Sequence, residues 1–94
     1  MNMEKQELIK KLEGYSQTID GMFYVNGDSR TYEKAVNITR NVRFLFPDIK
    51  RLDCWNDALE QYSMHSAHSR KKDALDEFTR TAKLDLQMII GSLE

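Results

Sequence analysis

Apolar residues recur at steps of three and four along most of the chain, and the longest such run is the last one. In an α-helix, which has about 3.6 residues per turn, positions at these steps share one face. The stripe in the last run consists of Leu75, Phe78, Ala82, Leu86, Ile89, Ile90 and Leu93. Leu84 and Met88 lie four apart on a second line beside it. This wide apolar face predicts a helix over residues 70–93 that packs against more than one neighbour.

Two segments in the first half of the chain have the same period and predict two more helices. The first, over residues 4–24, carries Leu8, Leu12, Tyr15, Ile19, Met22 and Phe23. The second, over residues 29–46, begins at Asp28 or Ser29, because both are good N-caps. It ends at Pro47, since the residue before a proline avoids the helical conformation.

The third helix, over residues 49–64, takes Asp48 as its N-cap and carries Ile49, Leu52, Trp55, Leu59 and Tyr62. The small and polar stretch 63–72 that follows predicts a connector. Asp73, with a second acid at Asp76, is typical of the N-cap of the last helix. The alternative is a fusion of the third and fourth helices through the connector, because nothing in it forbids a helix.

A strand interpretation competes with the helical one over residues 22–32. Met22–Val25 is rich in strand formers, and the Asn26-Gly27 pair that follows is a strong hairpin signal. The second arm, Asp28–Tyr32, is mostly polar and lacks a clear alternation. A helix followed by a turn is therefore the preferred prediction, with a short hairpin as its alternative.

The four amphipathic segments predict an all-α fold, most simply a compact bundle of about four antiparallel helices in a single domain over residues 1–94. An irregular orthogonal packing is the structural alternative, because the helices differ in length. One Pro and four Gly leave few turns, which argues against a many-stranded sheet. The predicted core contains Leu8, Leu12, Ile19, Val36, Ile38, Val42, Leu52, Trp55, Leu59, Leu75, Phe78, Ala82, Leu86 and Ile90.

Composition and charge narrow the choice of partners and compartment. The formal net charge of −1 gives no overall attraction to nucleic acid or to an anionic membrane. No apolar run is long enough to span a membrane, and acidic residues occur early in the chain, where a signal peptide would need its apolar segment. The single cysteine, Cys54, cannot form an internal disulfide and fits a reducing compartment. These features predict a cytoplasmic protein.

Candidate catalytic and metal-binding residues each have a simpler structural interpretation. His65 and His68, with Glu60 a turn earlier, share a spacing found in metal sites, but three or four supported ligands are needed and the chain has no further His. Cys54 precedes Trp55 without a nearby base, so we predict a buried structural thiol. No phosphate-binding loop or nucleophile motif is present. We therefore expect no enzyme activity, catalytic residue, metal or cofactor.

Basic and aromatic residues gather around Pro47, which raises the hypothesis of a nucleic-acid-binding regulator. The candidate contacts are Arg40, Arg43, Lys50 and Arg51, beside two phenylalanines. The helix after the proline carries apolar residues that we expect in the core, whereas the recognition helix of a helix-turn-helix is polar. A solvated basic face is the preferred interpretation, and nucleic-acid binding remains the alternative function.

Several large apolar residues lie at the margins of the predicted core stripes, more than a small bundle readily hides. They either complete a wide core or form an interface with another protein or a second copy of the chain. The candidate partner-binding residues are Phe44, Phe46, Leu84 and Met88. The sequence thus predicts a small non-enzymatic helical protein, an accessory, inhibitor or regulatory subunit that acts through protein–protein contacts. Mobile genetic elements encode many small helical proteins of this class. An origin of this chain in such an element is an analogy from its size and type only.

Overall fold

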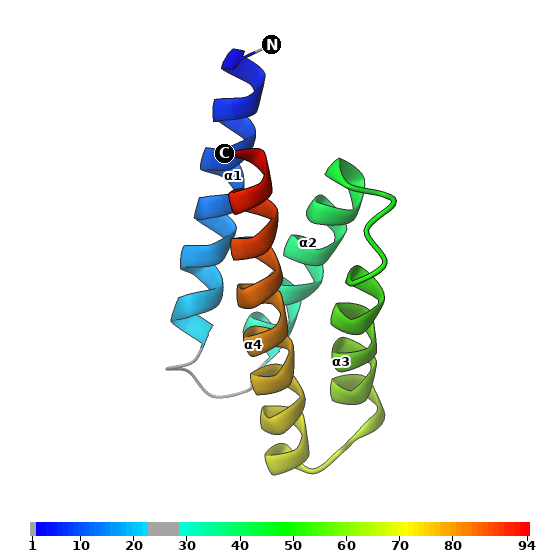
Figure 1. The fold of residues 1–94 in the computed structure, drawn as a ribbon. Coiled ribbons are helices and arrows are strands. Elements are labelled where there is room, and N and C mark those ends of the chain that lie inside the picture. Colours follow the sequence, from blue (N-terminus) through cyan, green and yellow to red (C-terminus); the bar gives the residue numbers. More distant parts are fainter. Residues whose placement is uncertain (1, 23–28) are drawn as a thin grey trace.

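The computed structural model describes residues 2–22 and 29–94, with side chains from Glu4 onward, and consists there of four helices (Figure 1). Consecutive helices run in opposite directions, which confirms the predicted all-α bundle. The helices are α1 (Asn2–Met22), α2 (Ser29–Leu45), α3 (Leu52–Met64) and α4 (His68–Leu93).

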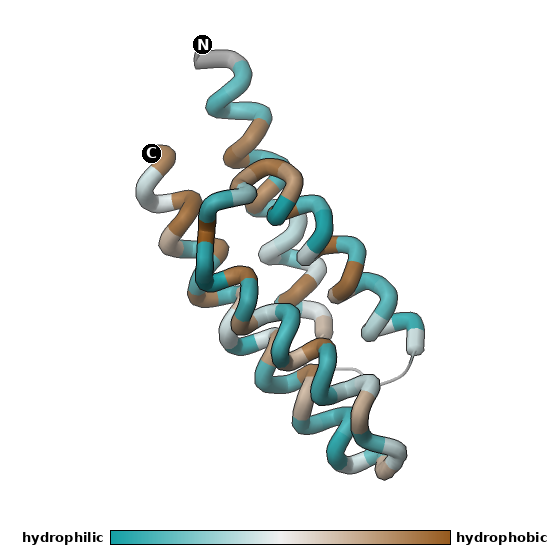
Figure 2. Tube along the Cα trace, turned by 90° about the vertical axis from the view of Figure 1, so that its right-hand side faces the viewer, coloured by the Kyte–Doolittle hydropathy of each residue, from teal (hydrophilic) through white to brown (hydrophobic). Residues whose placement is uncertain are grey.

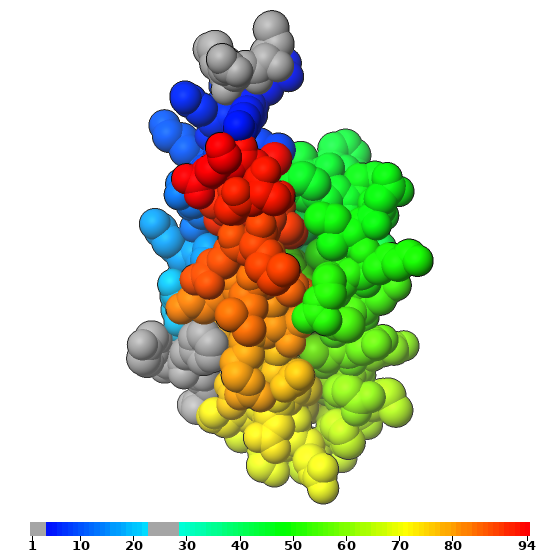
Figure 3. All heavy atoms as spheres, viewed as in Figure 1, coloured from blue at the N-terminus to red at the C-terminus, as the bar shows by residue number. Residues whose placement is uncertain are grey.

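Helix α4 is the element around which the bundle packs. It makes the most extensive contacts of any helix, with α3 on one side and α1 on the other, whereas α1 and α2 touch only lightly. The space-filling view shows α4 as a continuous ridge between α1 and α3 (Figure 3). The prediction that the last helix packs against more than one neighbour is confirmed.

The core is formed by one buried stripe from each helix, and hydrophobic positions recur along every helix between hydrophilic ones (Figure 2). Trp55 and Phe78 meet edge to face at its centre, with ring centroids 5.9 Å apart. Most of the predicted core is buried, but Leu8 and Val36 are only half-buried and pack against its edge. Leu8 belongs to the beginning of α1, which projects beyond the other helices (Figure 1). Buried apolar residues outside the predicted core are Met22, Ala35, Ala58, Tyr62 and Ala74.

Buried threonines complete the core without leaving their hydroxyl groups unpaired. Thr39 Oγ1 donates to the carbonyl oxygen of Ala35 at 2.8 Å, and Thr79 Oγ1 donates to that of Leu75 at 2.6 Å. A hydroxyl that bonds the carbonyl four residues earlier loses little when it is buried, because its donor is satisfied within the helix.

The connection between α2 and α3 differs from the prediction. Helix α3 begins at Leu52 rather than at Ile49, and Asp48 lies in the preceding turn rather than at the N-cap. The N-cap is Arg51, whose own backbone is helical (φ −56°, ψ −25°), so the helix is entered through a turn of hydrogen bonds three residues apart. A side-chain cap requires an extended N-cap residue, and this entry provides none.

The break between α3 and α4 is much shorter than the predicted connector. Only residues 65–67 interrupt the helices, with extended backbones at His65 (ψ 139°) and Ala67 (ψ 131°). The predicted N-cap at Asp73 is therefore wrong, because α4 begins at His68, and the alternative of one fused helix is also wrong.

A contact between three helices fixes this break. Tyr62 of α3 stacks on Tyr32 of α2 with ring centroids 4.4 Å apart. Lys71 of α4 lies 4.2 Å from the Tyr62 ring centroid, and its Nζ donates to the Tyr62 carbonyl oxygen at 2.8 Å. A cation satisfies one of the carbonyl groups that a helix leaves without a partner at its end.

Residues 29–32, which belong to the second arm of the alternative hairpin, form the first turn of α2. These four residues are therefore helical rather than extended. The remaining parts of the competing predictions for this region, including Asp28 as N-cap and Phe23 at the end of the first helix, lie outside the described residues.

Candidate functional site: the outer face of α4

Leu84 and Met88 lie on the outside of the bundle. Their exposed fractions are 62% and 72%, although every helix has a buried stripe elsewhere. With Arg51, Asp85 and Gln87 they line a shallow hollow of about 560 Å³ beside the beginning of α3. We call this surface the α4 face. These two side chains are therefore not part of the core, which was one of the two roles that the sequence left open.

A buried carboxylate forms the base of the α4 face. The side chain of Asp85 is only 7% exposed, and its Oδ2 accepts a hydrogen bond of 2.8 Å from Trp55 Nε1. Arg51 Nε donates to the same carboxylate at 3.2 Å. A buried charge is tolerated when it is paired and hydrogen-bonded, so this arrangement fixes Asp85, Trp55 and Arg51 relative to one another.

The sequence analysis missed Asp85. A signal was present, because Asp85 lies three residues after Ala82 and four before Ile89, on the apolar side of the helix. An acid on such a stripe needs a buried donor, and the one tryptophan of the chain is an obvious candidate.

Arg51 forms the edge of the α4 face. Its side chain is 60% exposed, and its Nη1 lies 3.7 Å from the sulfur of Cys54. Cys54 itself is exposed, so the predicted buried thiol is wrong. Its neighbours Leu52 and Trp55 occupy the buried stripe, and the intermediate position turns away from the core.

The candidate nucleic-acid residues are spread over α2 and the turn before α3. Arg43 pairs with Asp53 of α3, with Nη2 and Oδ1 2.9 Å apart, whereas Arg51 pairs with Asp85 of α4. Arg40 lies on α2 near Arg43, and Lys50 is exposed in the turn before α3. Two of the four cations are thus paired with carboxylates, on different helices.

The candidate partner-binding residues are also divided. Phe44 has an exposed fraction of 86% and lies with Arg40, Arg43 and Asn56 between α2 and α3. Phe46 is half-buried and packs against the core. Of the predicted set, only Leu84 and Met88 share a surface.

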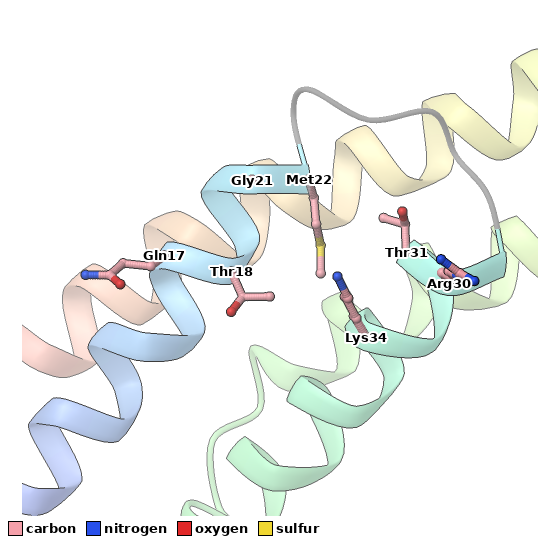
Figure 4. A pocket seen from close by; sticks show the side chains of 7 residues that line it. All are labelled: Gln17, Thr18, Gly21, Met22, Arg30, Thr31 and Lys34. Atoms are coloured by element: carbon pink, nitrogen blue, oxygen red, sulfur yellow. The ribbon is translucent and has the colours of Figure 1, made fainter.

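A further hollow of about 390 Å³ lies between the end of α1 and the beginning of α2. Figure 4 shows Met22 and Lys34 directed toward each other across it, with Gln17 directed away. Met22, at the edge of the hollow, is buried, and the hollow contains none of the candidate residues from the sequence.

His65 lies in the break before α4 and His68 is the first residue of that helix. Within residues 2–22 and 29–94, no group of three or more His, Cys, Asp or Glu side chains is placed to hold a metal ion. None of the described helices is long and apolar enough to cross a membrane.

Comparisons of the chain with models of protein families, with curated proteins and with solved structures found no match.

Proposed function

We propose that this protein is not an enzyme and acts by binding another protein through the α4 face. The observation that carries the proposal is the exposure of Leu84 and Met88, one helical turn apart, on a bundle whose core is complete without them. Large apolar side chains grouped on the surface of a small domain are typical of interfaces. Burying each of them against a partner would contribute about 1.5–3 kcal/mol.

Arg51 gives this interface a chemical preference. Its Nε is held by Asp85, and its side chain, which is 60% exposed, lines the same hollow as Leu84 and Met88. An arginine oriented in this way is suited to bind a carboxylate, and arginine is enriched among residues that dominate interface energies. The proposed partner therefore presents an apolar segment with a neighbouring Asp or Glu.

Charge favours a different protein over a second copy of this chain. Asp85 is buried and already bonded, and the nearest exposed acid toward the beginning of the same helix, Glu77, pairs with Arg80 at 2.9 Å. Two copies joined through their α4 faces would bring two Arg51 side chains of like charge together, which is unfavourable, whereas a different protein can place a carboxylate there. The proposal places this complex in the cytoplasm, where an exposed thiol such as that of Cys54 stays reduced.

The experiment is a capture from the native host with three forms of the protein. The wild type and Met64→Lys, which changes an equally exposed methionine at the end of α3, should retain the same protein, whereas Leu84→Lys/Met88→Lys should lose it. Retention of the same protein by the double variant would contradict the proposal. So would a stable homodimer of the wild type in sedimentation experiments that the double variant abolishes.

Nucleic-acid binding remains the rival hypothesis. It predicts binding of a duplex or single strand at low salt, where the contribution of phosphate contacts is greatest. We expect no binding, because Arg43 and Arg51 are paired with carboxylates and the chain is not basic.

A further inference from the structure

The outer surface between α2 and α3 is hollowed along most of the length of α2. Two hollows of about 320 and 380 Å³ have walls from both helices, a third of about 360 Å³ beside them is lined by α2 alone, and all three include Arg40. We call them together the α2–α3 groove. Along α2 the groove follows Tyr32, Val36, Arg40 and Phe44, which lie at successive steps of four and so share one face of the helix. At 1.5 Å per residue, this run is about 18 Å long, or three turns of a helix.

The floor of the groove is apolar. Leu59 of α3 is only 5% exposed at its centre, with the half-buried side chains of Val36 and Tyr32 beside it. At one end the ring of Phe44 is almost fully exposed. An apolar floor with one projecting aromatic ring suits the apolar stripe of a bound helix, which would cover these side chains at its own three-four spacing.

Both signs of charge line the groove. Glu33 and Glu60 border the part near Tyr32, Arg43 borders the part near Phe44, and Arg40 lies between, in the walls of all three hollows. Arg43 is compensated by Asp53. Within the described residues, no ion pair joins Glu33, Glu60 or Arg40 to another side chain. The groove therefore offers a ligand two carboxylates near Tyr32 and one cation, Arg40, further along α2.

We propose that the α2–α3 groove binds an amphipathic helix of another protein in a defined orientation. The helix places its apolar stripe over Leu59, Val36 and Phe44, an acidic residue against Arg40, and a basic residue against Glu33 and Glu60. Opposite charges at different positions along a groove select the orientation of the ligand more than its affinity. This surface shares no residue with the α4 face, so the protein has two independent binding surfaces.

A selection of random 18-residue peptides on the wild-type protein, with counter-selection on Phe44→Ser, tests this inference. The enriched peptides should carry apolar residues at three-four spacing, with an acidic residue near one end and a basic residue near the other. Their Kd should rise about tenfold or more on Arg40→Glu, because an attraction becomes a repulsion. Glu60→Lys should weaken the binding of the same peptides, because the new lysine repels their basic residue.

Two matched variants and one exchange of charge make the test specific. Arg70→Glu and Met64→Ser alter exposed side chains outside the groove and should leave the Kd within about twofold of the wild-type value. A peptide whose acidic residue is replaced by Lys should bind Arg40→Glu better than it binds the wild type. Circular dichroism of each variant checks that the fold is retained.

Failure to enrich any peptide, or enrichment of peptides whose Kd is unchanged by Arg40→Glu and Phe44→Ser, would overturn the inference. The outcome is separate from that for the α4 face. Leu84→Lys/Met88→Lys should bind the selected peptides with wild-type affinity, and the groove variants should still retain the partner of the α4 face.

Discussion

At the scale of single residues, Asp85 joins the core to the surface. Its carboxylate accepts from the buried indole of Trp55 and from the half-exposed guanidinium of Arg51. The same group therefore stabilises the contact between α3 and α4 and holds the cation at the edge of the α4 face. Its removal should affect both the stability of the fold and the position of Arg51.

Asp85→Ala should lower the free energy of unfolding by about 3 kcal/mol, because it leaves the buried Trp55 N–H without an acceptor. Asp85→Asn retains an acceptor oxygen for the indole and should cost less, about 1–2 kcal/mol. Denaturation in urea measures both values. The control is Asp53→Asn, whose exposed ion pair with Arg43 should contribute less than about 1 kcal/mol.

A double-mutant cycle of Trp55→Phe and Asp85→Ala isolates the hydrogen bond between the two side chains, because each single change removes it. We expect a coupling energy of about 1 kcal/mol or more, since residues in direct contact are not additive. Additive losses would mean that the indole and the carboxylate do not interact in solution.

At the scale of the element, the beginning of α4 is poorly capped. Ala67 is the N-cap, with the extended backbone that a capping residue needs, but no side chain there bonds the first turn. Ala67→Asp should raise the free energy of unfolding by about 1 kcal/mol by accepting from a backbone N–H of that turn. Thermal unfolding provides the measurement.

The neutral variant Ala67→Asn serves as the control for Ala67→Asp, because it can cap without adding charge. It should stabilise the protein by a similar amount. If α3 and α4 were one continuous helix, residue 67 would lie in its interior, and both changes would instead lower the melting temperature.

Lys71 connects α4 to the end of α3, and Lys71→Met should lower the free energy of unfolding by about 1–2 kcal/mol. The change removes the hydrogen bond to the Tyr62 carbonyl and the cation above the Tyr62 ring. Its neighbour provides a matched control, since Lys72 only pairs with Asp76 on the surface. Lys72→Met should change stability by less than about 0.5 kcal/mol. Equal effects of the two substitutions would contradict the role assigned to Lys71.

The helices could be predicted from the sequence because their buried stripes are local patterns. Leu52, Trp55 and Leu59 lie at three-four spacing and are buried, as expected. The ends of α3 and α4 could not be predicted from the same pattern. The break at residues 65–67 contains neither Pro nor Gly, and the Lys71–Tyr62 contact that accompanies it depends on tertiary packing.

The site was predicted only in part for a similar reason. Leu84 and Met88 were found because they lie beside the main stripe, but their period does not tell whether a neighbouring helix covers them. Asp85 was missed because its donor, Trp55, lies on another helix. Arg43 and Arg51 are close in sequence, yet they pair with carboxylates on α3 and α4, which a local pattern of charge does not reveal.

At the scale of the whole molecule, the two surfaces proposed for binding lie outside the core. The core is closed by residues from all four helices, while the α4 face and the α2–α3 groove lie on its outside. Substitutions of the exposed side chains Leu84, Met88 and Phe44 should leave the fold intact. A protein with two such surfaces is suited to join two partners, or two parts of one partner.

The most direct test of this account is the Kd of the captured partner for Leu84→Lys/Met88→Lys, measured by calorimetry beside the melting temperature. Loss of two buried apolar contacts should raise the Kd by at least about 100-fold. The melting temperature should stay close to that of the wild type, because both side chains are exposed in the free protein. Leu86→Lys serves as the contrasting control. It places a charge in the core and should therefore unfold the protein. An unchanged Kd, or a double variant that fails to fold, would contradict the assignment of the α4 face as a binding surface.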